Sequence, residues 1–316
     1  MTDYEFMLED RIAKIRAINE QYDLEHNSYL SFSGGKDSTV LHYLLDLALP
    51  GNKIPRVYAN TGIEYKMVRE YVKDLAKNDD RFVILNQTRN IKKTLEEFGY
   101  PFKSKEHSLR VDQFNKGKNA NYIKKYITGY DFKNGKPSKF VCPKSLKYQF
   151  EEKGKYNYSN LCCYKLKKDL MHRWQKENNI SVVLTGMRQE EGGNRTRLGC
   201  TIFEKGKLQK FHPLIVVSEE WEDDFLEKNN IKLCALYYPP FNFRRTGCRG
   251  CPFSLDLQKQ LDIMKKLLPN EYKQCELLWK PVYDEYRRIG FRLRPKVSDE
   301  QDKLYDVDLW EDEKVV

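Results

Sequence analysis

Residues 31–45 have the sequence SFSGGKDSTVLHYLL, and this stretch decides the fold. The segment Tyr29–Phe32 is typical of a short strand, and residues 38–49 are typical of a helix. Between them, Gly34 and Gly35 allow positive φ angles and a close approach of the backbone to a ligand. The stretch therefore predicts a strand, a tight turn and a helix whose first N–H groups form an anion cradle.

The alternation of strand and helix continues along the chain. Strands are expected at 54–59, 82–85 and 182–186, a β-hairpin around 205–207, and helices at 4–20, 65–76, 91–98, 163–177, 218–229 and after Cys251. Strands and helices that alternate through short connections predict an α/β fold. We expect a doubly wound, mostly parallel sheet with helices on both faces, a basic insertion and a helical C-terminal part.

The periodic pattern stops between residues 101 and 160, which are rich in Lys, Asn, Gly and Tyr. We expect hairpins and loops there, outside the central sheet. The predicted domains are an α/β domain of residues 1–100 and 161–255, a basic, aromatic-rich insertion at 101–160, and a helical extension at 256–316 with an acidic tail.

The net charge of +10 is unevenly distributed over the 316 residues. Residues 101–176 hold 19 Lys and Arg against 6 Asp and Glu, whereas residues 298–316 hold 8 acids and 2 lysines. The basic stretch is either a solvated surface or an anion-binding one. No apolar run approaches the roughly 20 residues of a membrane span, and the acidic N-terminus is unlike a signal peptide, so we expect a cytoplasmic protein without a membrane partner.

The turn SGGKDS carries more polar chemistry than a merely structural turn needs. Lys36 adds a cation, Asp37 a carboxylate, and Ser33 and Ser38 add hydroxyl donors to the backbone N–H groups. The spacing differs from the GxxxxGK[ST] loop of common NTPases, which excludes that assignment. A phosphate-binding loop of another class is the favoured interpretation.

The turn resembles the PP-loop of the adenine-nucleotide α-hydrolase group, and most closely that of the phosphoadenosine phosphosulfate (PAPS) reductase family. YANTGIEY at 58–65 resembles the second-strand motif of that family, and TGMRQEEGGNR at 185–195 resembles its Gly-x-Arg-x-x-Glu-Ser-x-x-Arg element. HPLI at 212–215 with SEEW at 218–221 resembles the segment that follows. The resemblance spans about residues 28–255, apart from much of 101–160.

The resemblance implies a site for ATP, or for the sulfonucleotides APS or PAPS, with Mg²⁺. The residues expected to bind the nucleotide are Ser33, Gly34, Gly35, Lys36, Asp37, Ser38, Asn60, Thr61, Gly62, Gly186, Arg188 and Arg195. Lys36, Asp37, Lys167 and Arg188 are the catalytic candidates. The loop and Lys36 would hold the β- and γ-phosphates, and Asp37 would help to place Mg²⁺.

Four of the eight cysteines have a spacing that suggests a metal site. Cys162 and Cys163 are adjacent, and Cys248 and Cys251 form a Cys-x-x-Cys pair that begins 85 positions after Cys163. Sets of four thiolates hold zinc or an iron–sulfur cluster. Adjacent cysteines chelate one ion poorly but can bind two irons of a cubane, which favours [4Fe–4S] over zinc or simple burial.

The cysteine pattern is also similar to that of APS reductases and of some PP-loop sulfur transferases. In that comparison, Lys167 occupies the place of a lysine near cluster and substrate. Burial is the default expectation for Cys142, Cys200, Cys234 and Cys275.

Three departures from the family argue against sulfonucleotide reduction. The chain ends LYDVDLWEDEKVV and lacks the C-terminal Glu-Cys-Gly nucleophile, Asn60 replaces an Asp, and Gly192 replaces a Ser. The insertion interleaves ten aromatic residues with lysines, which is typical of a nucleic-acid groove; a solvated insertion with a small aromatic core is equally compatible.

The favoured hypothesis is an ATP pyrophosphatase that adenylates an acceptor, such as tRNA or DNA, for sulfur transfer from a donor protein. One alternative is a sulfonucleotide reductase that uses another cysteine. The other is a nucleotide-binding module of a larger complex, without turnover.

Overall fold

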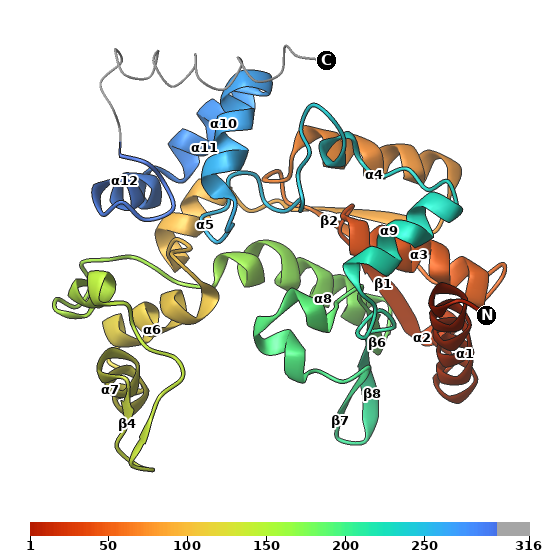
Figure 1. Ribbon diagram of the computed structural model, residues 1–316, viewed down its shortest axis with the longest axis horizontal. Helices are drawn as coiled ribbons and strands as arrows, with labels where there is room; N and C mark the ends of the chain where they lie inside the picture. The colour runs from red at the N-terminus through yellow and green to blue at the C-terminus, as the bar shows by residue number, and fades with distance from the viewer. Residues whose placement is uncertain (296–316) are drawn as a thin grey trace. The chain divides into compact units, whose positions relative to one another are not determined.

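A six-stranded sheet organises the first part of the chain, in the order β3-β2-β1-β6-β8-β7 (Figure 1). Its strands are β1 (Ser28–Phe32), β2 (Arg56–Asn60), β3 (Phe82–Asn86), β6 (Val182–Leu184), β7 (Thr201–Glu204) and β8 (Lys207–Phe211). β7 alone runs antiparallel to its neighbour, as a hairpin with β8, and the other pairs are parallel. The expectation of a mostly parallel sheet is confirmed. The structure is a computed structural model that describes residues 1–295, so the predicted acidic tail lies outside the described residues.

Alternate residues of β1 point to opposite faces of the sheet, as the strand period requires. Leu30 and Phe32 join a large core that also receives buried residues of α1 (Asp3–Tyr22), α3 (Lys36–Ala48), α4 (Lys66–Asn78) and α9 (Glu219–Lys228). Tyr29 packs on the other face with Met171 and Trp174 of α8 (Asp169–Glu177). Helices therefore cover both faces, as expected for a doubly wound sheet.

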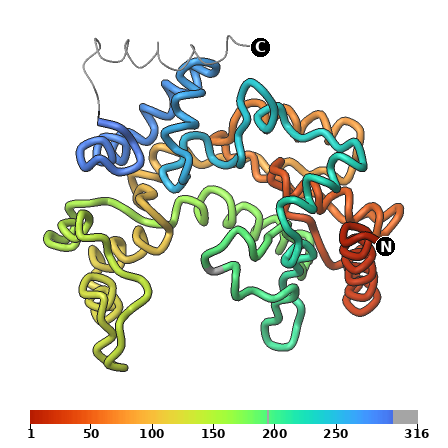
Figure 2. The backbone as a smooth tube through the Cα atoms, in the orientation of Figure 1, coloured from red at the N-terminus to blue at the C-terminus, as the bar shows by residue number. Residues whose placement is uncertain are grey.

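Contacts divide the chain into two units. The first comprises Met1–Leu95 and Cys162–Arg249, and the second comprises Glu96–Leu161 and the chain from Gly250 onward. The course of the backbone through each can be followed in Figure 2. The first unit also contains α2 (Leu24–Asn27), and α5 (Ile91–Phe98) spans the boundary. No helix within residues 1–295 is long and apolar enough to cross a membrane.

The second unit contains more helix than the sequence suggested. Residues 101–160 form α6 (Lys105–Asn115), α7 (Ala120–Thr128), the hairpin of β4 (Tyr130–Asp131) and β5 (Lys136–Pro137), and a 3₁₀ segment (Lys144–Phe150). The expectation of hairpins and loops alone is therefore wrong. Two of the three buried residues of α6 are His107 and Ser108, so the apolar period that announces a helix is missing. As expected, helices follow Cys251: α10 (Leu257–Leu267), α11 (Pro269–Leu278) and α12 (Lys280–Arg288).

Candidate active site

The loop after β1 is a preformed turn at the carboxyl end of the central strands. Gly34 has φ +73°, and a Cβ there would lie 2.8 Å from Cγ1 of Val68, so glycine is required on both counts. The hydroxyl of Ser38 donates to the carbonyl of Gly35 over 3.0 Å and accepts from the N–H of Ser33 over 3.2 Å. Two predicted serines thus fix the loop from within.

The N–H groups of Gly35 and Lys36, at the N-terminus of α3, donate to hydroxyl oxygens. The N–H of Gly35 lies 3.2 Å from Oγ of Ser33, and the N–H of Lys36 lies 2.9 Å from the phenol oxygen of Tyr237. Hydroxyl groups rotate easily and are themselves donors, so phosphate oxygens can replace them as acceptors at this helix N-terminus. Tyr237, which sequence analysis did not single out, closes the loop from a segment two hundred residues away.

Gly186 brings a second motif against the start of α3. A Cβ on Gly186 would lie 2.5 Å from the carbonyl oxygen of Asp37 and 2.7 Å from its carbonyl carbon. No side chain can occupy that space without displacing backbone. The segment that follows β6 therefore lies directly on the first turn of α3, which places Arg188 beside Asp37.

Arg188 is buried, with 3% of its side chain exposed, among three carboxylates. Its Nε lies 3.2 Å from Asp37 and 3.1 Å from Glu222, and its Nη1 lies 2.6 Å from Glu190. Burial lowers the pKa of Arg188, but Glu222 and Asp37 outweigh it and raise that pKa. The guanidinium is a fixed cation at the N-terminus of α3.

Glu222 is a fully buried acid that sequence analysis missed. It lies on α9 between the buried apolar residues Trp221 and Phe225. Burial, together with the charge of Asp37, raises its pKa to about 9. The carboxyl is therefore protonated at neutral pH. An acid inside the apolar stripe of a helix was the available sequence signal.

Glu222→Gln should flatten the pH dependence of stability. Between about pH 4.5 and 9 the carboxyl keeps its proton in the folded protein and loses it in the unfolded chain. The wild-type free energy of unfolding therefore falls as pH rises, at a limiting slope of about 1.4 kcal/mol per pH unit from this one group. The amide cannot titrate and lacks this contribution. Urea unfolding of both proteins from pH 5 to 9, without nucleotide, measures the difference; parallel curves would contradict it.

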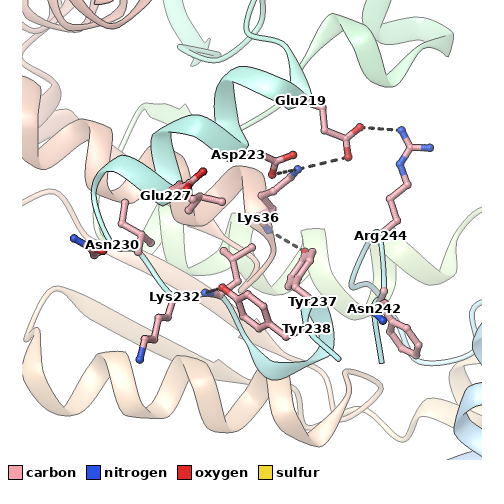
Figure 3. Close-up of a pocket in the computed structure, with 14 residues that line it drawn as sticks. Lys36, Glu219, Asp223, Glu227, Asn230, Lys232, Tyr237, Tyr238, Asn242 and Arg244 are labelled. Carbon is pink, nitrogen blue, oxygen red and sulfur yellow. Dashed lines mark hydrogen bonds and ion pairs between the residues drawn. The ribbon is translucent and has the colours of Figure 1, made fainter. Parts of the chain in front are cut away.

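A cavity of about 600 Å³ lies beside Lys36, between α9 and residues 230–244 (Figure 3). The ammonium of Lys36 lies 2.8 Å from Asp223 and 3.5 Å from Glu219. Arg244 donates a hydrogen bond from Nη2 to Oε2 of Glu219, the oxygen that does not face Lys36. This hydrogen bond and the charge of Lys36 together lower the pKa of Glu219 to about 2. Of the predicted nucleotide-binding residues, only Lys36 lines this cavity.

The predicted residues at the end of β2 point to different partners. Nδ2 of Asn60 donates to Oδ1 of Asn86 over 2.7 Å, at the ends of the neighbouring strands β2 and β3. Thr61 donates its N–H and its hydroxyl to Glu64, at 3.0 and 2.9 Å. Gly62 has φ +82° and makes the turn between them possible. Thr61 is thus occupied with Glu64.

Lys167 forms an ion pair with the buried Glu64. Its Nζ lies 2.8 Å from Oε1 of Glu64, a carboxylate with a 3% exposed side chain. Burial raises the pKa of Glu64, but Lys167 outweighs it and lowers that pKa. Lys167 lies in a five-residue π-helical turn (Tyr164–Lys168) that precedes α8, in place of the regular helix expected from residue 163. Such turns occur often at functional sites.

Cys248 belongs to the same cluster. Residues 63–64 pair with residues 248–249 through an isolated bridge and a 2.9 Å hydrogen bond from the N–H of Arg249 to the carbonyl of Ile63. Burial raises the pKa of the Cys248 thiol; Lys167 opposes that rise and Cys163 adds to it. Cys163 and Lys167 therefore both lie within electrostatic reach of Cys248.

The predicted metal ligands are partly placed by the structure. Cys162 and Cys163 lie at the start of the helical segment that carries Lys167, and Cys248 belongs to the same unit. Cys251, three residues after Cys248, belongs to the second unit. Within residues 1–295, no group of three or more His, Cys, Asp or Glu side chains has the arrangement of a metal site. The four-cysteine ligand set stays a prediction. Cys142, Cys234 and Cys275 are buried, as expected, and Cys200 is half-buried.

Arg195, the last predicted nucleotide ligand, is 39% exposed and pairs with Glu191 at 2.7 Å. Arg245 reaches the same carboxylate at 3.1 Å. The structure thus brings Gly186, Arg188 and Asp37 together with the loop. Asn60 and Arg195 have local partners of their own.

The motifs described above lie within the residues that match a known protein family. The model of the phosphoadenosine phosphosulfate reductase domain family matches residues 27–134 and 138–254. An uncharacterized protein of Methanocaldococcus jannaschii is 28% identical over 156 residues, which is 46% of this chain and 37% of that protein. The match thus spans well under half of that relative's length.

Two solved structures show a distant likeness to the chain. The PAPS reductase from Candida auris, in a phosphate complex, is 14% identical with a TM-score of 0.41, covering 70% of this chain and 81% of that one. The U34-tRNA thiolase NcsA from Methanococcus maripaludis, with its [4Fe-4S] cluster, is 15% identical with a TM-score of 0.39, covering 88% and 79%.

Proposed function

The chain belongs to the phosphoadenosine phosphosulfate reductase domain family, and on this premise we propose that it is an ATP pyrophosphatase that activates an acceptor for sulfur transfer. One observation carries the proposal. Gly186 packs on Asp37, so that the glycine loop at the end of β1 and the buried Arg188 after β6 meet at the N-terminus of α3. Ligands of open α/β sheets bind at the carboxyl ends of such neighbouring strands.

In the proposed reaction, the loop 33–38 binds the β- and γ-phosphates of ATP. The N–H groups of Gly35 and Lys36 exchange their hydroxyl acceptors for phosphate oxygens, and the dipole of α3 favours the negative charge. An acceptor oxygen attacks the α-phosphorus in line, and the bond to the bridging oxygen breaks with both electrons leaving on pyrophosphate. Lys36 and Arg188 are the fixed cations that stabilise the charge that develops there.

The carboxylates around these cations favour a nucleotide that arrives with Mg²⁺. Glu219 and Asp223 surround Lys36, and Asp37 lies against Arg188. The negative phosphates of a free nucleotide would be repelled by these carboxylates. A divalent cation relieves this repulsion, because it binds carboxylate and phosphate oxygens. Asp37, with 35% of its side chain exposed, is the residue proposed to hold the metal.

The chemistry of the cysteines fits a [4Fe–4S] cluster held by Cys162, Cys163, Cys248 and Cys251. Thiolates carry negative charge, and Lys167 lies beside Cys248 where it offsets that charge. When bound, the cluster would supply a site that carries or activates sulfur. Lys167 and Glu64 would keep their ion pair and hold the turn 61–64 against the Cys248 segment.

Cys163→Ser should remove iron without unfolding the protein. Cys163 is half-buried and begins a helical segment, where serine fits the same space. We expect about four irons per chain in anaerobically purified wild type and loss of most of them in the variant, because a cubane needs its thiolates. Iron and sulfide analysis with EPR spectra measures this, and Cys200→Ser is the matched control. Equal iron in both variants would refute the ligand set, and zinc in the wild type would refute the cluster.

A substrate panel separates the proposed function from its rivals. The protein is incubated with Mg²⁺ and ATP, APS or PAPS, with tRNA or single-stranded DNA as acceptor and a thiol donor, and pyrophosphate, AMP and sulfite are measured. The proposal predicts pyrophosphate from ATP and no sulfite. Sulfite from APS or PAPS would instead identify a sulfonucleotide reductase. Tight nucleotide binding without any product would identify a binding module.

A further inference from the structure

Four aromatic rings of the second unit are exposed near its β-hairpin. Tyr122 of α7 is 59% exposed, Tyr130 of β4 41%, Phe132 in the hairpin turn 65%, and Phe140 after β5 63%. The rings of Tyr130 and Phe132 contact each other edge to face at 5.2 Å. We call these four residues the aromatic tip.

The core of the second unit is built from other aromatic rings. Its own core contains Phe102, Tyr126, Phe150 and Tyr158, which are all at most 8% exposed. Phe102 stacks on Tyr158 at 4.4 Å, and Tyr126 packs edge to face on Phe150 at 6.0 Å. The four rings of the aromatic tip are thus not part of this core.

The aromatic tip lies in a strongly basic segment. Residues 116–147 contain nine lysines and one acid, Asp131. That acid is already paired with Lys125 at 2.5 Å. The guanidinium of Arg110 lies 5.1 Å from the ring centre of Tyr122. The positive charge around the tip is therefore largely uncompensated.

A cavity of about 370 Å³ opens among these groups. Its lining includes the rings of Tyr122 and Phe140 and the basic side chains of Arg110, Lys125, Lys136 and Lys139. Glu106 and Asp131 also line it and pair with Arg110 and Lys125, so Lys136 and Lys139 supply its net positive charge. Rings and cations therefore face one hollow.

We propose that the aromatic tip and its surrounding lysines bind single-stranded nucleic acid. Lysines neutralise phosphates along the strand, while exposed rings stack on bases that a duplex would keep hidden. The hollow between Tyr122 and Phe140 accepts an unstacked base beside cations. The inference deepens the proposed function by naming the class of acceptor. Strand binding itself does not depend on that function, whereas the role of the bound strand as acceptor rests on it.

Fluorescence anisotropy with labelled strands of about 12 nucleotides, within the usual range of site sizes, tests the inference on the full chain without ATP. Single-stranded DNA and RNA should bind, and a duplex of the same sequence should bind at least about ten-fold more weakly. Tighter binding of RNA than of DNA would identify single-stranded RNA as the ligand. Equal affinities would show that the protein recognises the phosphates and bases that RNA and DNA share. Both results support the inference.

Two sets of variants separate the contributions of rings and lysines. Tyr122→Ala with Phe132→Ala and Phe140→Ala should weaken binding by about ten-fold per ring that stacks. Lys133→Gln with Lys136→Gln and Lys139→Gln should reduce the dependence of log affinity on log salt by about two. Leu277→Ala, which removes an even more exposed apolar side chain of the same unit, is the matched control and should leave binding unchanged.

Unchanged affinity in the ring variant, equal affinity for the duplex, or binding to vesicles of anionic lipid without binding to strands would overturn the inference. Circular dichroism shows whether each variant is folded; single-ring variants replace the triple variant if it is not. Lys36→Ala should bind the strands like wild type. Strand binding without pyrophosphate release would refute the proposed function and leave the inference intact.

Discussion

Arg188→Ala is expected to destabilise the protein by about 3 kcal/mol, because removal of one partner from a buried ion pair leaves uncompensated charge. The guanidinium lies within 3.2 Å of Asp37, Glu190 and Glu222 and has 3% of its side chain exposed. The same change should reduce pyrophosphate release by at least about 100-fold, as is typical when a preorganised group at the developing charge is lost. Thermal and urea unfolding, with steady-state assays, measure both effects.

A double variant distinguishes the two roles of Arg188. Glu190→Gln in the Arg188→Ala background removes a carboxylate that the guanidinium no longer balances, so part of the lost stability should return while activity stays low. Arg89→Ala is the matched control, since Arg89 is 40% exposed and pairs with one carboxylate, Asp169. Such an exposed pair contributes less than about 1 kcal/mol. If Arg188→Ala were as stable and active as Arg89→Ala, the role given to Arg188 would be wrong.

Gly186→Ala should have the second largest effect. The added methyl carbon would lie 2.5 Å from the carbonyl oxygen of Asp37. That oxygen belongs to the backbone, so it cannot move aside as the end of a flexible side chain could. We expect a loss of about 1–3 kcal/mol of stability from overpacking. The added methyl group should push the first turn of α3 away from the segment that carries Arg188. The affinity for nucleotide should therefore fall at least about ten-fold. Calorimetric titration with ATP and Mg²⁺ measures it.

Gly199→Ala provides the control for that experiment. A Cβ on Gly199 would meet only the carbonyl oxygen of Thr201, at an ordinary 3.7 Å, and the residue lies outside the loop 33–38. Its affinity for nucleotide should equal that of the wild type. Equal affinities in all three proteins would show that the contact between Gly186 and Asp37 is unimportant for the site.

The sheet could be predicted because local patterns determine it. β1, β2 and β3 lie within one or two residues of their expected positions, since short apolar runs between helices leave few alternatives. The hairpin of β7 and β8 was expected from Lys205-Gly206, where both residues have positive φ. The assignment of the glycine loop and Arg188 to one candidate site came from the family resemblance rather than from periodicity.

The rest of the site depends on contacts that no local pattern reveals. Glu219 and Asp223 face Lys36 from more than 180 residues away, and Tyr237 closes the loop from 201 residues away. α6 was missed because its buried face includes His107, which hydrogen-bonds to Tyr126 and to Gln149. Polar cores of this kind satisfy burial without an apolar period.

The most direct test of the central claim is the rate of pyrophosphate release from ATP in wild type, Lys36→Ala and Lys53→Ala. Lys36 lies at the start of α3, whereas Lys53 is an exposed lysine before β2, at the opposite edge of the sheet. The account predicts AMP, free or on the acceptor, with equimolar pyrophosphate in the wild type and the Lys53 variant, and a loss of at least about 100-fold in the Lys36 variant. Release of ADP and phosphate, or a Lys36 variant as active as the Lys53 variant, would contradict it.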